Sequence, residues 1–223
     1  MSSGIAPIDS FLGGGLAKGE LLLLFGERGT GKTSFAFQAV IRAASMGIGS
    51  TVIYTNGLMP VARLMELAGS EWPKVSNIVW ILEVKNFEDQ DLLVDSLEEK
   101  LPPNTGLLII DSITACYRGA LGEVGENIPL NKALNRELAI IKDLCSRKGM
   151  TAVLTSEVTS QLDGKGSKPV AAAILTYWAD HVMRLDRVQG DVRKVTLIKP
   201  PSSKEALLRL SAGGLESFGE GRK

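Results

Sequence analysis

The sequence predicts an α/β fold with a mostly parallel central sheet flanked by helices and a C-terminal antiparallel extension. Short, nearly all-apolar runs alternate with helical patterns along most of the chain, which is typical of βαβ units. After Pro169 the runs alternate apolar and polar residues instead, as antiparallel strands with one solvated face do. The 223 residues are 44% hydrophobic and 22% charged, a globular composition.

Each element is expected from a local pattern. The parallel strands are Glu20–Phe25, Thr51–Thr55, Ile78–Leu82, Leu107–Asp111 and Thr151–Thr155. Helical patterns cover Lys32–Met46, Val61–Ala68, Asp89–Lys100 and Ile128–Lys148, the last with Asn127 as its expected cap. The extension comprises Val182–Leu185, Val192–Lys199 and Ala206–Leu210. We expect residues 1–223 to form a single domain.

A phosphate-binding loop follows the first strand. The residues fit G-x-x-x-x-G-K-[ST] at every fixed position: Gly26, Glu27, Arg28, Gly29, Thr30, Gly31, Lys32 and Thr33. Glycines let backbone N–H groups surround an anion, and the following helix adds the positive end of its dipole. Lys32 supplies a charge to the terminal phosphates, and the Thr33 hydroxyl suits magnesium. The sequence therefore predicts ATP and Mg²⁺ as ligands of this loop and the following Ser34.

A second magnesium element is expected at Asp111. The apolar strand Leu107–Asp111 delivers one carboxylate to its C-terminal end. P-loop ATPases hold magnesium with such an aspartate. Lys32 and Asp111 are accordingly predicted catalytic residues, and Thr33 and Asp111 predicted metal ligands.

The overall charge excludes a global attraction to nucleic acid. Lysine plus arginine and aspartate plus glutamate both total 25, so DNA binding would need a local patch. The two cysteines, Cys116 and Cys145, are expected as buried free thiols and not as a zinc site. We see no membrane-spanning run and no targeting segment, so the sequence predicts a cytoplasmic protein without a membrane partner.

The chain resembles a known group of ATPases. Residues 4–20, with the string Leu12-Gly13-Gly14-Gly15, are similar to the segment that precedes the phosphate loop in RecA-type recombinases and KaiC-type ATPases. The segment Asp111–Arg118 resembles its counterpart in RadB, the archaeal recombinase paralogue. The resemblance covers nearly the whole chain, and we expect no N-terminal DNA-binding domain of the kind that full recombinases have. It implies a RecA-type P-loop NTPase core, ATP binding, DNA association and a role in homologous recombination and DNA repair.

Two departures from the recombinase pattern concern catalysis. The recombinases have a glutamate after the second core strand that orients the attacking water, and Asn56 matches it here. Asparagine cannot accept a proton, and losing a general base typically costs about 10² to 10⁴ in rate. The phosphate-sensing element after the fifth strand is replaced by Ser156-Glu157, which resembles KaiC-like proteins more. Glu157 is a candidate substitute base, with repulsion of the γ-phosphate and backbone hydrogen bonding as the alternatives.

Candidate DNA contacts follow from the same resemblance. Recombinases bind DNA with loops after the fourth and fifth core strands, which match residues 118–126 and 159–169. The first loop holds Arg118 with Glu123 and Glu126, and the second holds Lys165 and Lys168 with Asp163. The stretch Arg184–Arg209 carries seven cations and three anions. A DNA-facing strip, a contact to a neighbouring subunit's nucleotide and a solvated sheet face are all open readings of that stretch.

The sequence supports one leading hypothesis. The chain is expected to be a RadB-like accessory protein that binds ATP, hydrolyses it weakly or not at all, and assists recombinational repair. One alternative is a KaiC-like regulatory ATPase that acts only through protein partners; another is a true DNA-dependent ATPase with an unrecognised base. A recombinase or other protein partner, and homo-oligomerisation, remain open.

Overall fold

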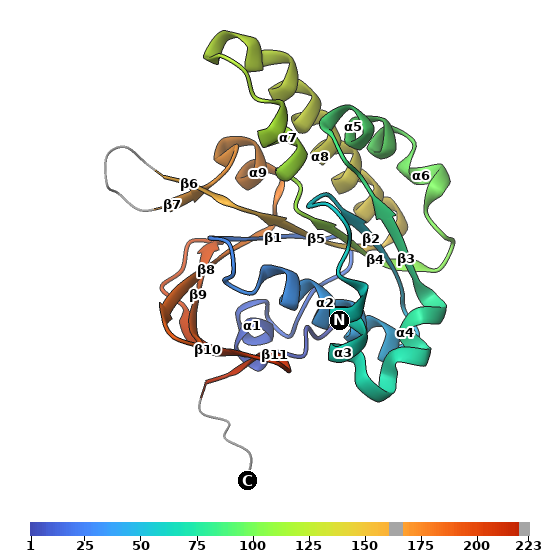
Figure 1. The fold of residues 1–223 in the computed structure, drawn as a ribbon, viewed down its shortest axis with the longest axis vertical. Coiled ribbons are helices and arrows are strands. Elements are labelled where there is room, and N and C mark those ends of the chain that lie inside the picture. Colours follow the sequence, from blue (N-terminus) through green and yellow to red (C-terminus); the bar gives the residue numbers. More distant parts are fainter. Residues whose placement is uncertain (161–166, 219–223) are drawn as a thin grey trace.

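The computed structural model describes residues 1–160 and 167–218. Within them, a nine-stranded sheet has the order β11-β10-β9-β8-β1-β5-β4-β2-β3 (Figure 1). Its strands are β1 (Leu21–Gly26), β2 (Gly49–Tyr54), β3 (Val79–Glu83), β4 (Thr105–Asp111), β5 (Thr151–Ser156), β8 (His181–Gln189), β9 (Val192–Lys199), β10 (Glu205–Ser211) and β11 (Gly214–Ser217). The strands from β8 to β3 in that order pair in parallel. The pairs β8–β9, β9–β10 and β10–β11 are antiparallel.

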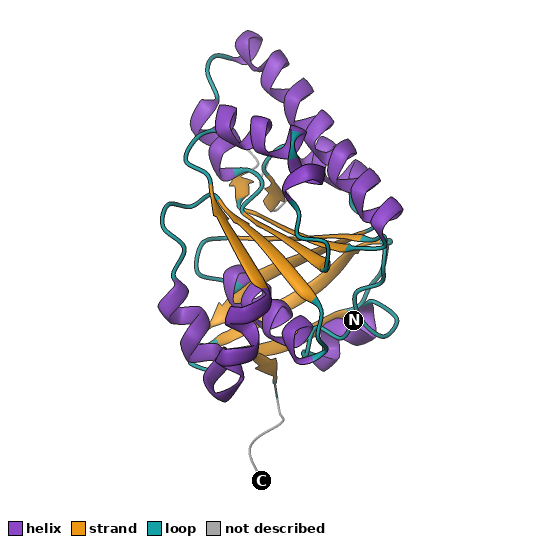
Figure 2. Cartoon of the chain, turned by 90° about the vertical axis from the view of Figure 1, so that its right-hand side faces the viewer, coloured by secondary structure: helices purple, strands orange, loops and turns teal. Residues whose placement is uncertain are grey.

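Helices cover both faces of the sheet (Figure 2). One layer holds α1 (Ala6–Phe11), α2 (Lys32–Ser45), α3 (Val61–Ala68) and α4 (Trp72–Ile78). The other holds α5 (Phe87–Asp95), α6 (Leu97–Lys100), α7 (Ala115–Ala120), α8 (Ile128–Lys148) and α9 (Ala172–Trp178). Alternate residues of β1 serve the two cores: Leu22 and Leu24 pack with the first layer, and Leu21 and Leu23 with the second. Burial on both faces explains why β1 is apolar throughout.

The predicted architecture is confirmed, and the five expected parallel strands are present within one or two residues. Strand β8 is a junction, since it is parallel to β1 and antiparallel to β9. Both cysteines are buried free thiols, as expected. The sequence did not predict α1, α4, α9 or β11, which are short.

Two helix predictions were wrong in detail. The expected helix Asp89–Lys100 begins earlier, at α5, and breaks at Ser96, whose hydroxyl donates to the Leu92 carbonyl at 2.9 Å. Such local bonding by serine competes with helix continuation. Asn127 precedes α8 but does not cap it, because its side chain accepts from the Gly122 N–H at 3.0 Å instead.

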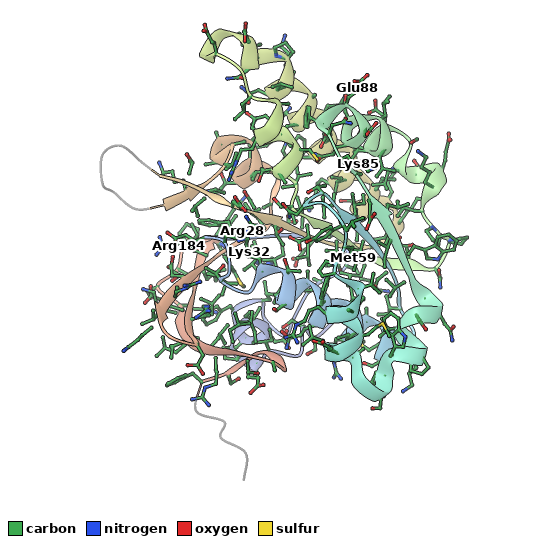
Figure 3. The ribbon with its side chains drawn as sticks, in the orientation of Figure 1. Arg28, Lys32, Met59, Lys85, Glu88 and Arg184 are labelled. Atoms are coloured by element: carbon green, nitrogen blue, oxygen red, sulfur yellow. The ribbon has the colours of Figure 1, made fainter. Side chains whose placement is uncertain are left out.

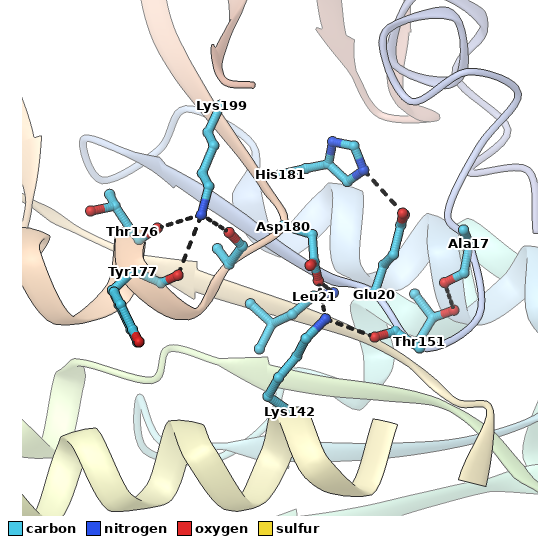
Figure 4. A network of polar contacts seen from close by, with 12 residues as sticks. Ala17, Glu20, Leu21, Lys142, Thr151, Thr176, Tyr177, Asp180, His181 and Lys199 are labelled. Atoms are coloured by element: carbon cyan, nitrogen blue, oxygen red, sulfur yellow. Dashed lines mark hydrogen bonds and ion pairs between the residues drawn. The ribbon is translucent and has the colours of Figure 1, made fainter. Parts of the chain in front are cut away.

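Polar contacts hold together the edge of the sheet opposite the phosphate loop (Figure 4). Lys142 of α8 donates to the Gly19 carbonyl at 2.9 Å and contacts Asp180. Asp180 also accepts from the Leu21 N–H at 2.8 Å, which joins the start of β1 to the start of β8. His181 Nε2 lies 3.1 Å from a carboxylate oxygen of Glu20. These contacts fix β8 beside β1, which brings the C-terminal strands close to the phosphate loop.

A search of the described residues for a helix long and apolar enough to cross a membrane finds none.

Candidate nucleotide-binding site

The predicted phosphate loop joins the end of β1 to the start of α2. Gly29 and Gly31 have φ angles of 77° and 109°, in the left-handed region that favours glycine. Gly31 is also the residue that precedes the first turn of α2. The loop therefore presents the N-terminus of α2, with its positive dipole end, to the space above the sheet.

Lys32 is folded back over the loop. The residue is 8% exposed, and its Nζ donates to the carbonyls of Gly26 and Glu27, both at 2.8 Å. Burial lowers the pKa of Lys32, while the charges of Glu157, Asp111 and Glu27 oppose that shift. The arrangement keeps the Lys32 ammonium beside the loop and close to two carboxylates, those of Asp111 in β4 and Glu157 just after β5.

Asp111 is held by two hydroxyl groups. Thr33 Oγ1 donates to Asp111 Oδ2 at 2.7 Å, and Thr155 Oγ1 of β5 donates to Oδ1. The aspartate is 2% exposed. A threonine hydroxyl next to a carboxylate offers the hard oxygen ligands that Mg²⁺ prefers, so the residues present fit that ion.

A cleft of about 810 Å³ opens over these groups. Predicted site residues that line it are Arg28, Gly29, Gly31, Lys32, Thr33, Ser34, Asn56, Asp111 and Glu157. Figure 3 shows Arg28 and Lys32 together at the end of β1. Gly26, Glu27 and Thr30 do not line the cleft; Thr30 is buried within the loop, where its hydroxyl donates to the Glu27 carbonyl at 2.9 Å.

The cleft also holds the two residues that differ from recombinases, Asn56 and Glu157. Tyr54 pairs with Asp111 across β2 and β4, and the Thr55 N–H donates to the Asp111 carbonyl at 3.0 Å. Asn56 follows directly and lines the cleft, as the sequence predicted. Glu157 follows β5 and forms an ion pair with Arg118 of α7, whose side chain is about half-exposed. The carboxylate proposed as a base is therefore already paired.

Sequence reasoning missed several lining residues. Tyr54, Ser112, Thr114 and Leu210 carry no motif, and Arg118 was assigned only to a DNA loop. Ser112 and Thr114 follow Asp111 directly, so their place in the chain was a usable signal. Leu210 comes from β10, and nothing in the local sequence indicates that β10 lies against the phosphate loop.

The first predicted DNA loop, residues 118–126, is mostly ordered into short helices. Arg118 to Ala120 belong to α7, and residues Val124–Asn127 form a 3-10 helix. Glu123 and Glu126 form a capping box, with the Glu123 N–H donating to the Glu126 carboxylate at 3.2 Å. These reciprocal side-chain contacts stabilise the start of the 3-10 helix although the loop contains three glycines. The loop's one cation, Arg118, is paired with Glu157.

The two flanks of the second predicted DNA loop, 159–169, pair with each other as antiparallel strands. Strands β6 (Val158–Ser160) and β7 (Ser167–Pro169) form a two-stranded ribbon that projects from the body in Figure 1. Lys168 is exposed and lies opposite Thr159. Asp163 and Lys165 lie outside the described residues.

The cations of Arg184–Arg209 are largely engaged within the sheet. Arg184, Lys194 and Arg209 pair with Asp186, Glu205 and Asp191 respectively. Lys199 donates to the carbonyls of Thr176, Tyr177 and Ala179, at the end of α9 (Figure 4). This internal pairing favours the solvated-face reading over a DNA-facing strip.

The geometry agrees with a family match. A profile described as Rad51 matches residues 1–217. The chain belongs to the Rad51 family. Membership accounts for the strand–loop–helix at the nucleotide site and for the position of Asp111.

Relatives within the family extend along the whole chain. A "DNA repair and recombination protein RadB" of Methanococcoides burtonii is 29% identical over 91% of this chain and 90% of its own length. A protein of the same name from Methanosphaera stadtmanae is 28% identical over 89% and 86%. A structure titled "Crystal structure of the RadB recombinase" is similar with a TM-score of 0.80 and 25% identity, covering 97% of this chain and 98% of that one. The chain is thus a RadB-like, RecA-type recombinase paralogue, and the expected resemblance is confirmed.

Proposed function

We propose that this chain binds magnesium-ATP in the cleft, hydrolyses it slowly, and assists DNA repair and recombination as a nucleotide-responsive accessory protein. The names of its RadB relatives support the repair role. The observation that carries the nucleotide assignment is the contact between Thr33 and Asp111, 2.7 Å long, directly in front of the phosphate loop.

Each part of the ligand has a matching group. The backbone of residues 26–34 and the start of α2 would surround the phosphates, with Lys32 as the counter-charge. Thr33 and Asp111 would hold magnesium, which neutralises phosphate charge when bound.

Slow hydrolysis is inferred from Asn56 and Glu157. The Asn56 amide can orient a water molecule but cannot accept its proton. Glu157 is the other candidate base, and its carboxylate is already engaged in an ion pair with Arg118, which competes with an attacking water for it. Lys32 would still bind phosphate, so ATP would act chiefly as a bound ligand.

The ion pair also suggests how occupancy is reported. Arg118 lies at the start of the first loop, and Glu157 lies at the base of the β6–β7 ribbon, where its carbonyl accepts from the Val170 N–H at 3.1 Å. Partly exposed ion pairs are weak, so a γ-phosphate can compete with Glu157 for Arg118. Nucleotide binding would then alter the contact that joins the two loops.

DNA contact is proposed through the ribbon more than through the first loop. Lys168 is exposed on the ribbon, whereas Arg118 is already paired. The test is a titration of the protein with labelled single-stranded and duplex DNA, with and without ATP, at two salt concentrations. ATP-sensitive, salt-sensitive binding is expected. No DNA binding at low salt would contradict the DNA role and favour a regulatory ATPase that acts through proteins.

A further inference from the structure

Arg193 of β9 lies buried beside the phosphate loop. The residue is 5% exposed, and among the described residues its guanidinium donates only to backbone carbonyls: Gly190 at 2.8 Å, Val192 at 3.0 Å and Gly29 of the loop at 3.4 Å. Its Nε is buried without a hydrogen-bond partner among the described residues. A second cation adjoins the same point, because a side chain at Gly29 would meet Arg187 Nη2 at 3.0 Å.

No carboxylate within ion-pair distance of Arg193 is found in the described part of the chain. Asp191, which attracts it, is engaged by Arg209 at 3.1 Å. Burial and the charge of Arg187 lower the pKa of Arg193. Lys199 of β9 likewise donates to backbone carbonyls, but it does so at the end of α9 and not at the phosphate loop. A buried charge without a counter-ion is costly to the folded protein, so its presence beside an anion-binding loop calls for a partner that arrives later.

Arg193 is close enough to the loop to act on it through its charge. Its Nη2 lies 3.4 Å from the Gly29 carbonyl, and the C=O and N–H of a trans peptide point in opposite directions. The Thr30 N–H on the other side of that peptide makes an equally long contact, 3.4 Å, with the Glu27 carbonyl. Because both contacts are long, the main effect of Arg193 is the positive potential that it adds beside the Gly29–Thr30 peptide.

The C-terminal strands are firmly fixed against the loop, so the position of Arg193 is determined. A side chain at Gly31 would meet Leu215 at 3.2 Å and Leu210 at 3.4 Å. Gln38 of α2 donates to the Leu215 carbonyl at 2.9 Å and accepts from its N–H at 2.8 Å, as a neighbouring strand would. The antiparallel extension is therefore a buttress of the nucleotide site.

We propose that Arg193, with Arg187 beside it, is a positioning residue that supplies the phosphate loop with an uncompensated charge for a nucleoside polyphosphate. This inference rests on the proposed nucleotide function. The bound polyphosphate is the missing counter-charge, so the benefit increases with the number of phosphates. The arginine lowers the stability of the ligand-free protein and raises the affinity for the ligand.

The test compares three variants by thermal unfolding without nucleotide and by calorimetric titration with magnesium-ATP and magnesium-ADP. Arg193→Met removes the charge at similar volume, and Arg193→Lys keeps it. Lys194→Met, the adjacent residue paired with Glu205, removes an equal charge away from the loop. We expect Arg193→Met to have an unchanged or higher Tm, and an ATP affinity lower by about tenfold, with a smaller loss for ADP. Arg193→Lys should retain most of the affinity, and Lys194→Met should match the native protein.

Three results would overturn the inference. One is native ATP affinity in Arg193→Met. Another is a lower Tm in Arg193→Met with equal losses for ATP and ADP and no rescue by Arg193→Lys, which would make the residue a structural support. The third is failure of the native protein to bind either nucleotide, which alone would also remove the proposed function.

Discussion

Two groups of cleft residues differ in what they are ready to do. In the first group, Lys32 and Asp111 are buried and each side chain makes two hydrogen bonds. In the second group, Asn56 is exposed and Glu157 is in a partly exposed ion pair. The first group is held in place by its hydrogen bonds, while the one carboxylate of the second group is already engaged. The comparison supports the proposal that the chain binds ATP but hydrolyses it slowly.

The largest effect is expected at Lys32. Lys32→Ala removes the phosphate charge and should reduce ATP affinity by about a hundredfold or more while the fold persists. Calorimetry with magnesium-ATP measures this. Arg42→Ala is the matched control, since it removes an equal charge from an exposed position of the same helix. Unchanged ATP affinity in folded Lys32→Ala would exclude this loop as the site.

The next largest effect is expected at Asn56. Asn56→Glu restores a carboxylate beside Asp111 and should raise ATP turnover by about tenfold or more, because a general base typically contributes about 10² to 10⁴. Repulsion from Glu157 reduces the gain, so the variant is compared with Asn56→Glu combined with Glu157→Gln. The readout is steady-state phosphate release. Turnover that stays at the native level in both variants would show that more than the base is missing.

A buried acid, Glu137, is expected to make the stability of the folded protein depend on pH. Glu137 of α8 is fully buried, and Gln90 donates both to it at 2.7 Å and to the Ile113 carbonyl, just after Asp111, at 3.2 Å. Burial raises the pKa of Glu137 to about 8, although the Gln90 hydrogen bond opposes this. A folded-state pKa above the unfolded value means that the stabilisation is complete below about pH 4.5 and is lost as pH rises through about 8.

Glu137→Gln should remove that dependence. The native protein is expected to lose about 2 kcal/mol of unfolding free energy between about pH 6 and 9, and the variant much less. Urea unfolding at several pH values measures it, with Glu99→Gln, an exposed carboxylate, as the control. Parallel pH profiles for native and Glu137→Gln proteins would mean that Glu137 is ionised in the folded state.

The smallest effect is expected on the β6–β7 ribbon. If Lys168 contacts a DNA phosphate, Lys168→Ala should weaken binding about equally for all sequences and reduce the slope of affinity against salt by about one. Lys204→Ala, an exposed lysine on the C-terminal side, serves as the control. An unchanged slope for Lys168→Ala would place the DNA contact elsewhere.

Sequence reasoning worked where the determinants are local. The phosphate loop, the β4 strand with Asp111 and the delivery of Asn56 to the cleft all follow from short patterns, and the structure has them as expected. The missed features depend on contacts between distant segments. Arg118 and Glu157 are 39 residues apart, and Leu210 and Arg193 reach the loop only because β8 pairs with β1. The short helices of the first loop were not predicted, because their Glu123–Glu126 capping box lies outside any apolar periodic pattern.

The most direct test of the central claim measures binding and hydrolysis on the same native protein, with DNA present. We predict saturable, magnesium-dependent ATP binding by calorimetry together with phosphate release far below the typical enzyme rate of about 10 per second. Glu157→Gln should leave that slow release unaffected. Brisk native release that Glu157→Gln abolishes would contradict the account, because it would make Glu157 a working base.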